Sequence, residues 1–124
     1  MLKAAELPAD ALSLDLEDAV PIAEKAGARL AVASFLREQP SGPRDQQLWV
    51  RVNSRDSGEL VADLLALSGL RFDVVNVPKA EQPRDVHVVE DLLAHLEPDG
   101  ACIRIVPTIE TPAGLRNALA IAQA

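Results

Sequence analysis

The sequence predicts an α/β fold made of four consecutive βα units with parallel strands. Four short runs rich in Val, Ile and Leu alternate with four segments of helical periodicity. The aromatic residues are only Phe35, Trp49 and Phe72, so Ala, Val, Leu and Ile must fill the core. That composition suits layered α/β packing better than an all-β sandwich. Because a helix separates each strand from the next, we expect parallel strands and right-handed crossovers.

Each expected element has a local reason. The expected strands cover residues 11–16, 48–53, 73–77 and 101–106, and the expected helices cover 23–36, 59–67, 83–96 and 114–123. In the second helix Leu60, Leu64 and Leu67 share one face. Pro and Gly residues between 40 and 43 end the first helix. Thr111 as N-cap and Pro112 in the first turn begin the last helix.

The first strand has one apolar and one polar face. Leu12, Leu14 and Leu16 alternate with Ser13, Asp15 and Glu17. A strand of a doubly wound sheet would be apolar on both faces. The pattern therefore favours a barrel, in which the leucines meet the helices and the polar residues point into the barrel mouth. A free-standing α/β domain with an unrelated ligand stays open as an alternative, and a doubly wound strand order would favour it.

Charge and composition exclude several classes of protein. The chain has 124 residues, with 12 Lys and Arg against 19 Asp and Glu, and this net charge of −7 argues against a nucleic-acid or anionic-membrane partner. No segment approaches the roughly 20 apolar residues that span a bilayer, and acidic residues come too early for a secretory signal. The single cysteine, Cys102, excludes an internal disulfide framework and is expected in the core. We therefore expect one soluble, cytoplasmic domain over residues 1–124.

Polar residues follow each expected strand, at the edge where parallel α/β folds bind ligands. The sequence 15–18 places three carboxylates within four residues. They could coordinate a metal, position water or transfer protons, since crowded carboxylates shift each other's pKa. Alternatively, they form a solvated loop in which Asp18 caps the next helix.

Three further candidate site residues each have two possible interpretations. Arg51 within an apolar strand could clamp an anionic substrate, or pair internally with Asp15 or Glu17. Lys79 could reach substrate or be a solvated loop lysine. Glu110 could ligate Mg²⁺, or be a carboxylate favoured by a helix N-terminus.

Four motifs occur in order along the chain. They are Leu14–Pro21 with Glu24-Lys25 and Ala28-Arg29, then Val50–Asn53, Val77–Glu81 and Ile109–Thr111. Together they resemble the citrate lyase β-subunit-like branch of the HpcH/HpaI aldolase/citrate lyase family. The resemblance covers about residues 10–122, and four weak motifs in register are fairly specific.

The resemblance implies a partial TIM (β/α)8-type barrel and a lyase. Such a lyase uses Mg²⁺ to cleave or form a carbon–carbon bond beside a carboxylate, in a hydroxy acid or its CoA thioester. The implied catalytic residues are Glu17, Asp18 and Arg51, the substrate-binding residues are Arg51, Asn53 and Lys79, and the metal ligand is Glu110. Arg51 would hold the keto-acid or enolate oxygens, and Glu17 and Asp18 would organise the metal-bound water and the proton transfer.

The sequence departs from the family in length. A complete barrel needs eight strands and typically about 250 residues, and only four strands are expected here. By comparison, the family's first strand and the later strand with a second metal-binding Asp are missing. A fragment, a truncated gene product, a half that pairs with a second copy, and a non-catalytic binding or assembly module all stay open. Two unpaired strand edges lead us to expect a homo-oligomer.

Overall fold

The fold follows the expected alternation of strands and helices. The computed structural model describes residues 8–39, 45–96 and 102–124. Its strands are β1 (Ala11–Asp15), β2 (Gln47–Arg51), β3 (Val74–Val77) and β4 (Arg104–Pro107). Its α-helices are α2 (Lys25–Arg37), α3 (Leu60–Leu67), α4 (Pro83–Leu96) and α5 (Pro112–Ala122). Short 3-10 turns, η1 (Ile22–Glu24) and η2 (Arg55–Ser57), precede α2 and α3.

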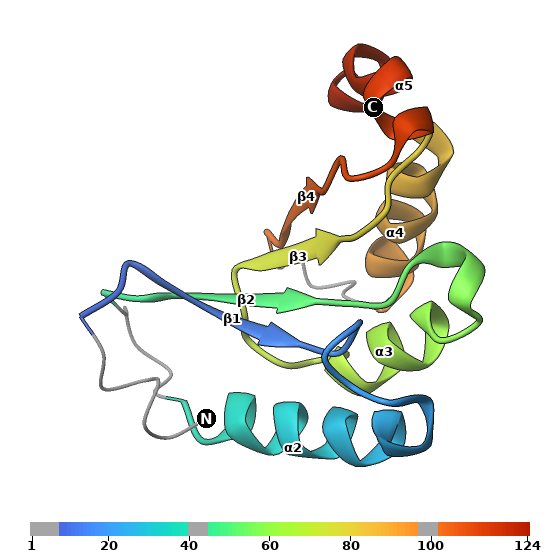
Figure 1. Ribbon diagram of the computed structural model, residues 1–124. Helices are drawn as coiled ribbons and strands as arrows, with labels where there is room; N and C mark the ends of the chain where they lie inside the picture. Colours follow the sequence, from blue (N-terminus) through green and yellow to red (C-terminus); the bar gives the residue numbers. More distant parts are fainter. Residues whose placement is uncertain (1–7, 40–44, 97–101) are drawn as a thin grey trace.

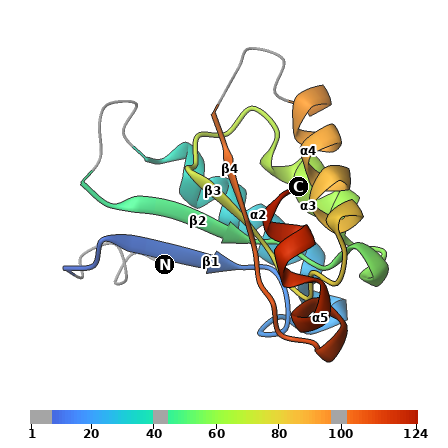
Figure 2. The same ribbon diagram turned by 90° about the horizontal axis from the view of Figure 1, so that it is seen from above.

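The four strands form one parallel sheet in the order β1-β2-β3-β4. This sequential order confirms the barrel-type arrangement and differs from the reversing order of a doubly wound sheet. Helices α2, α3 and α4 lie on one side of the sheet, as Figures 1 and 2 show. Along the chain each helix contacts the next, from α2 through to α5.

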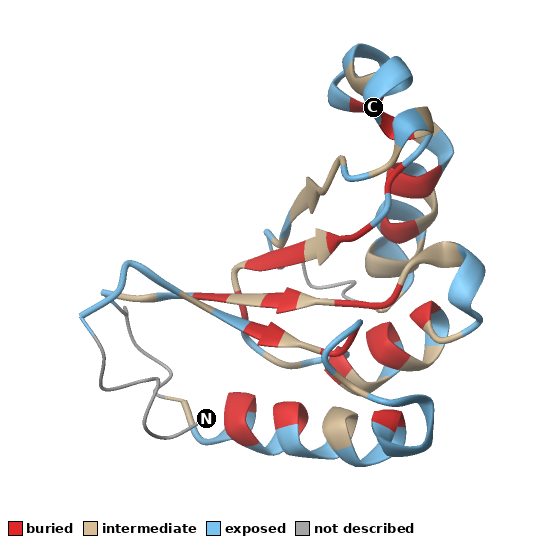
Figure 3. Cartoon of the chain, in the orientation of Figure 1, coloured by how far each residue is buried: buried red, intermediate tan, exposed pale blue. Residues whose placement is uncertain are grey.

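The core lies between the sheet and these helices. Alternate strand residues such as Leu14, Leu48, Val50 and Val75 point into it and are fully or almost fully buried. Figure 3 shows the buried positions on the strands and on the facing sides of the helices. The helix side of each strand is therefore apolar, as the leucines of the first strand predicted.

The opposite strand positions line up across the sheet. The register places Asp15 beside Arg51, Arg51 beside Asn76, and Asn76 beside Val106. Because side chains alternate between faces, this row points away from the helices. Polar residues at matched positions thus reach the same face from three strands.

The last helix depends on a close approach. Thr111 Oγ1 accepts a hydrogen bond of 3.0 Å from the N–H of Gly114, which confirms the predicted N-cap. Gly114 lies against the loop after β3, where a Cβ atom would overlap the carbonyl oxygen of Ala80. Only glycine allows α5 to begin this close to that loop.

One predicted detail was wrong, and two others fall partly or wholly outside the described residues. Cys102 is exposed and precedes β4, so it is not the core residue that was expected. The fourth strand begins at Arg104, and the predicted start at residue 101 lies outside the described residues. The Pro and Gly residues at 40–43 that were expected to end the first helix also lie outside them.

In the described part of the chain, no helix is long and apolar enough to cross a membrane.

Candidate functional site

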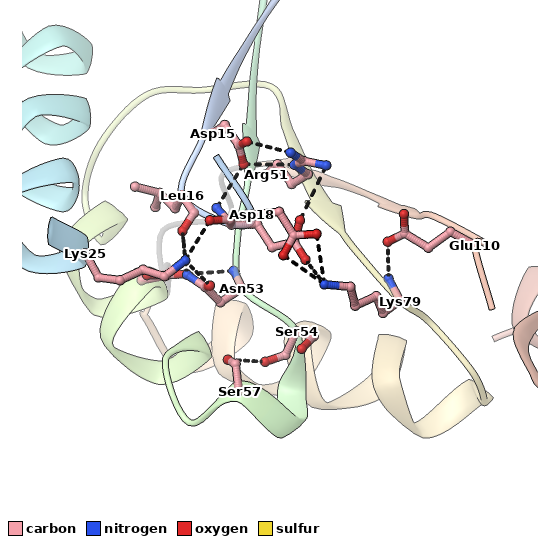
Figure 4. Close-up of polar contacts among 12 residues, drawn as sticks. Asp15, Leu16, Asp18, Lys25, Arg51, Asn53, Ser54, Ser57, Lys79 and Glu110 are labelled. Atoms are coloured by element: carbon pink, nitrogen blue, oxygen red, sulfur yellow. Dashed lines mark hydrogen bonds and ion pairs between the residues drawn. The ribbon is translucent and has the colours of Figure 1, made fainter. Parts of the chain in front are cut away.

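The carboxyl ends of the strands bring together side chains from four separate parts of the sequence. Asp15, Glu17 and Asp18 come from the end of β1, Arg51 from β2, Lys79 from the loop after β3, and Glu110 from the segment after β4. Figure 4 shows them as one connected group of polar contacts. The parallel sheet explains the grouping, since all four strands end at the same edge.

Arg51 is held by two carboxylates. Its Nε and Nη2 atoms donate to the two oxygens of Asp15, over 2.8 and 2.5 Å. Its Nη1 atom lies 3.4 Å from Oε2 of Glu17. The hydrogen bond to Asp15 raises the pKa of Arg51, so the guanidinium stays charged. The internal ion pair is therefore present, while about a third of the side chain (32%) remains exposed at the sheet edge.

The pKa of Asp15 lies below its ordinary value of 3.8. Burial alone would raise this pKa, but hydrogen bonds from Arg51 and from the backbone N–H of Glu17 outweigh that effect. Asp15 therefore stays ionised and fixes the plane of the guanidinium.

Glu17 is the buried carboxylate of the group, with only 3% of the residue exposed. Its Oε1 atom accepts a hydrogen bond of 2.5 Å from Nζ of Lys79. Its Oε2 atom is buried and receives no hydrogen bond in the described part of the chain. One oxygen of Glu17 therefore keeps its capacity to accept a hydrogen bond.

Lys79 connects Glu17 to Asp18. Its Nζ atom lies 3.0 and 3.1 Å from the two oxygens of Asp18, whose side chain is largely exposed. This contact lowers the pKa of Asp18, and the contacts with Glu17 and then Asp18 raise the pKa of Lys79. The backbone of Lys79 has a φ of 53°, a left-handed conformation that is uncommon for a residue with a side chain. Lys79 is thus an ordered part of the group and not a freely solvated loop residue.

Glu110 joins the group through the same loop. Its Oε1 atom accepts a hydrogen bond of 2.9 Å from the backbone N–H of Lys79. The residue is exposed and immediately precedes the N-cap Thr111. A hard cation such as Mg²⁺ takes one or two protein carboxylates and completes its shell with water and substrate oxygens, which Glu110 fits as one ligand. Among residues 8–39, 45–96 and 102–124, no group of three or more potential metal ligands is present.

Asn53 lies beneath this group and is 3% exposed. Its Nδ2 atom donates to the carbonyl oxygen of Leu16 and to Oδ2 of Asp63, while its Oδ1 atom accepts from Nζ of Lys25. These contacts use the side-chain amide inside the protein. The predicted role of Asn53 in substrate binding stays a prediction, and its observed contacts are those of a supporting residue.

The structure decides between several of the alternatives. The N-cap position of α2 belongs to Glu24, so Asp18 does not cap that helix. Four predicted residues lie in direct contact, namely Glu17, Asp18, Arg51 and Lys79.

Sequence reasoning missed Lys25 and Asp63 as parts of this region. Both are charged residues on helices and both are buried. A signal existed in their spacing: Lys25 and Arg29 are four residues apart on α2, and Glu59 and Asp63 are four apart at the start of α3. Such pairs lie on one helix face and indicate two complementary surfaces.

Comparison with known sequences gives a consistent picture. The sequence model of the HpcH/HpaI aldolase/citrate lyase family matches residues 1–124. The chain is 39% identical over 123 residues to the citrate lyase subunit beta of Escherichia coli K12, covering 94% of this chain and 39% of that protein. It is 36% identical over 121 residues to the malyl-CoA/beta-methylmalyl-CoA/citramalyl-CoA lyase of Chloroflexus aurantiacus, covering 93% of this chain and 34% of that protein.

Solved structures agree with these sequences. The citrate lyase beta subunit of M. tuberculosis, complexed with oxaloacetate and magnesium, matches with a TM-score of 0.70 and 34% identity over 98% of this chain and 46% of that one. RipC from Yersinia pestis matches with a TM-score of 0.75 and 28% identity over 97% of this chain and 49% of that one. The chain thus spans from about a third to a half of the length of these relatives.

Three findings agree: the four-stranded parallel sheet, the ordered motifs at its carboxyl edge, and the comparisons with known proteins. The chain has an α/β fold of the TIM-barrel type, and it belongs to the HpcH/HpaI aldolase/citrate lyase family.

Proposed function

We propose that this chain provides the substrate-binding edge of a carbon–carbon bond lyase of the retro-aldol or Claisen type. Its substrate would be a hydroxy acid or the CoA thioester of one. The observation that carries the proposal is the partly exposed Arg51, oriented by Asp15 and Glu17 at the carboxyl ends of the strands. The names of the relatives, citrate lyase and malyl-CoA lyase, support this class of reaction.

Arg51 would bind the oxygens of the keto acid or of the enolate. Two of its nitrogens are engaged by Asp15, and Nη1 is the least tightly engaged, at 3.4 Å from Glu17. Cleavage of the carbon–carbon bond develops negative charge on an enolate oxygen, which a fixed guanidinium stabilises where it forms. Because Asp15 already orients the guanidinium, little reorganisation is needed on binding.

Glu17 and Asp18 would organise the proton transfer. Asp18 is the exposed carboxylate of the two and the one that a substrate hydroxyl can reach, whereas Glu17 is buried beside Arg51 and would act through Lys79, which contacts both carboxylates. Lys79 holds the other oxygen of Glu17 and would contribute a second positive charge toward an anionic substrate. The residues thus combine a base with two cations at one edge.

Glu110 would hold Mg²⁺ together with water and substrate oxygens. When bound, the cation supplies further stabilisation of the enolate charge. The M. tuberculosis relative in complex with magnesium and oxaloacetate supports the choice of Mg²⁺ as the cation.

The proposal is tested by titrating the purified chain with Mg²⁺ and oxaloacetate in a calorimeter, with the mass measured by light scattering. We expect saturable, Mg²⁺-dependent binding by a discrete oligomer, because β1 and β4 are unpaired edges of the described sheet. Arg51→Ala should weaken oxaloacetate binding by about a hundredfold, the cost of a lost charge-assisted pair. Glu110→Ala should remove the Mg²⁺ dependence of oxaloacetate binding.

Exposed residues of the same types provide matched controls. Arg104→Ala at the start of β4 and Glu90→Ala on α4 should leave both titrations unchanged. Unchanged binding in Arg51→Ala and Glu110→Ala would refute the assignment. Binding without turnover of any CoA thioester would instead favour a non-catalytic binding module.

A further inference from the structure

Lys25 is a buried cation directly below the candidate site. It is the first residue of α2 and is 8% exposed. Its Nζ atom donates three hydrogen bonds of 2.7 Å, to the carbonyl oxygens of Leu16 and Glu17 and to Oδ1 of Asn53. The ammonium group has three protons, and all three are used. Figure 4 shows Lys25 reaching these atoms from the helix side of the site.

A network of hydrogen bonds between charged and polar side chains holds Lys25 and Asn53 in place. Asp63 is fully buried, and its Oδ2 atom accepts from both the backbone N–H and the Nδ2 of Asn53, over 2.7 Å each. Its Oδ1 atom accepts from Nε of Arg29, which also pairs with Glu59. Since Nδ2 of Asn53 is committed to two acceptors, its Oδ1 atom must face Lys25. The network therefore determines where the ammonium group lies.

The acceptors of Lys25 are neutral, which separates its role from that of an ordinary ion pair. A buried cation without a direct carboxylate partner costs free energy on folding. Two of its acceptors also have other donors, since the Leu16 carbonyl oxygen accepts from Nδ2 of Asn53 and the Glu17 carbonyl oxygen accepts from the N–H of Val20. A contribution to stability is thus a weak explanation for a lysine at this position. Its contacts point to another role, because two of its hydrogen bonds end on the backbone segment that carries Glu17 and Asp18.

We propose that Lys25 is a positioning residue for the acidic pair Glu17 and Asp18, with Asn53 and Asp63 as its supports. It holds the carbonyl oxygens of Leu16 and Glu17, so that the Glu17 carboxylate points toward Arg51 and Lys79. The Glu17 carbonyl oxygen also accepts from the N–H of Val20 and thereby closes the turn that contains Asp18. Any effect of Lys25 on substrate binding or catalysis rests on the proposed function. Its effect on the backbone around Glu17 and Asp18 can be tested without a substrate.

The first test measures amide hydrogen exchange in Lys25→Met, which keeps the length of the side chain and removes the ammonium group. We expect exchange of the Val20 amide to accelerate at least tenfold over the wild type, with the Val75 amide in the core as the reporter of overall stability. Val32→Ala is the matched control, because it enlarges a buried site on the same helix without touching the network. It should leave the Val20 exchange rate unchanged, because this turn amide opens locally, while the Val75 rate rises with the loss of overall stability.

The second test measures Mg²⁺-dependent oxaloacetate binding in the same variants. Lys25→Met should weaken binding about tenfold, Lys25→Arg should recover part of the loss because it keeps the charge, and Val32→Ala should bind like the wild type. If Lys25→Met does not fold, Lys25→Arg serves for both tests, since a planar guanidinium cannot direct three bonds as an ammonium does. Its Val20 amide should then exchange faster than in the wild type.

The two tests separate the two proposals. A Val20 exchange rate that stays at the wild-type value in Lys25→Met, or in Lys25→Arg if only that variant folds, would overturn the positioning role. Absence of oxaloacetate binding in the wild type would refute the proposed function, and the Val20 exchange rate would still decide the role of Lys25. Equal loss of binding in Lys25→Met and Val32→Ala would show that Lys25 acts only through overall stability.

Discussion

Asp15 and Arg51 show how a neighbouring pair prepares a site. They occupy paired positions on β1 and β2, so the register itself places the carboxylate beside the guanidinium. Charge-assisted, two-point bonds of this kind fix orientation as well as distance. The internal ion pair that the sequence left open is therefore present, and the substrate-binding role of Arg51 stays a prediction that the exposed part of its side chain permits.

The depressed pKa of Asp15 predicts a dependence of stability on acid. A carboxylate whose pKa is lower in the folded state stabilises the fold above its unfolded pKa, and this contribution is lost as pH falls through the folded pKa. The contribution should be present at neutral pH and decline below about pH 4, near the ordinary value of 3.8. Because the pair is partly exposed, its magnitude should be under about 1 kcal/mol.

Asp15→Asn tests this expectation by urea unfolding between pH 2.5 and 7. The variant should be less stable than the wild type at pH 7, and the difference should shrink toward low pH. Asp56→Asn, an exposed residue in η2, is the control and should follow the wild type at every pH. A difference that grows as the pH falls would contradict the assigned sign.

Among the elements, α5 depends on a close contact with a segment distant from it in sequence. The helix packs against the loop after β3 through Gly114, while Ile121 forms a small apolar cluster with Ala80 and Val86. Asn117 also donates a hydrogen bond of 2.7 Å to the carbonyl oxygen of Glu81. The position of α5 is thus linked to the loop that contains Lys79.

Gly114→Ala should destabilise the protein by about 1–3 kcal/mol, the usual cost of forcing an extra methyl group into a packed site. Its Cβ atom would overlap the carbonyl oxygen of Ala80 and displace the start of α5. Thermal unfolding measures the loss.

Gly27→Ala on α2 is the matched control, since nothing lies within 4 Å of its added Cβ atom. Alanine is the better helix former, so this variant should gain roughly 0.5–1 kcal/mol. Equal effects of the two substitutions would show that helix propensity, and not the close approach, governs Gly114.

The described part of the molecule has one main core. A single apolar cluster joins residues from β1, β2 and β3 to residues from α2, α3 and α4, and Ile105 of β4 packs against it. Because the helices lie on one side of the sheet, the other face is left to the polar row and the site. Because the two faces differ in this way, the buried carboxylate of Glu17 and its charged partners lie at the strand ends without interrupting the apolar core.

Two adjacent leucines on α3 test this arrangement. Leu64 is 1% exposed and Leu65 is 58% exposed. Leu64→Ala should cost about 2–5 kcal/mol through lost burial and the cavity that remains. Leu65→Ala should stay within about 0.5 kcal/mol of the wild type. Both are measured by chemical denaturation, and a large loss in Leu65→Ala would indicate that this exposed face is covered in solution.

Local patterns in the sequence determined the type and order of the elements. Apolar periodicity, the Thr111 cap and the alternation along the first strand are properties of neighbouring residues, so they could be read without a structure. They also placed polar residues at strand ends, and the parallel sheet then brought Glu17, Arg51 and Lys79 together as expected.

Only the tertiary structure decided which partners these residues have. Lys79 pairs with Glu17 and Asp18 across more than 60 positions of sequence, and Asn53 turns toward Lys25 and Asp63 beneath the site. Nor did local pattern reveal that Cys102 is exposed while Lys25 is buried. Such contacts depend on strand register and on the packing of α2 against α3. Those are set by the whole core and not by the spacing of any one segment.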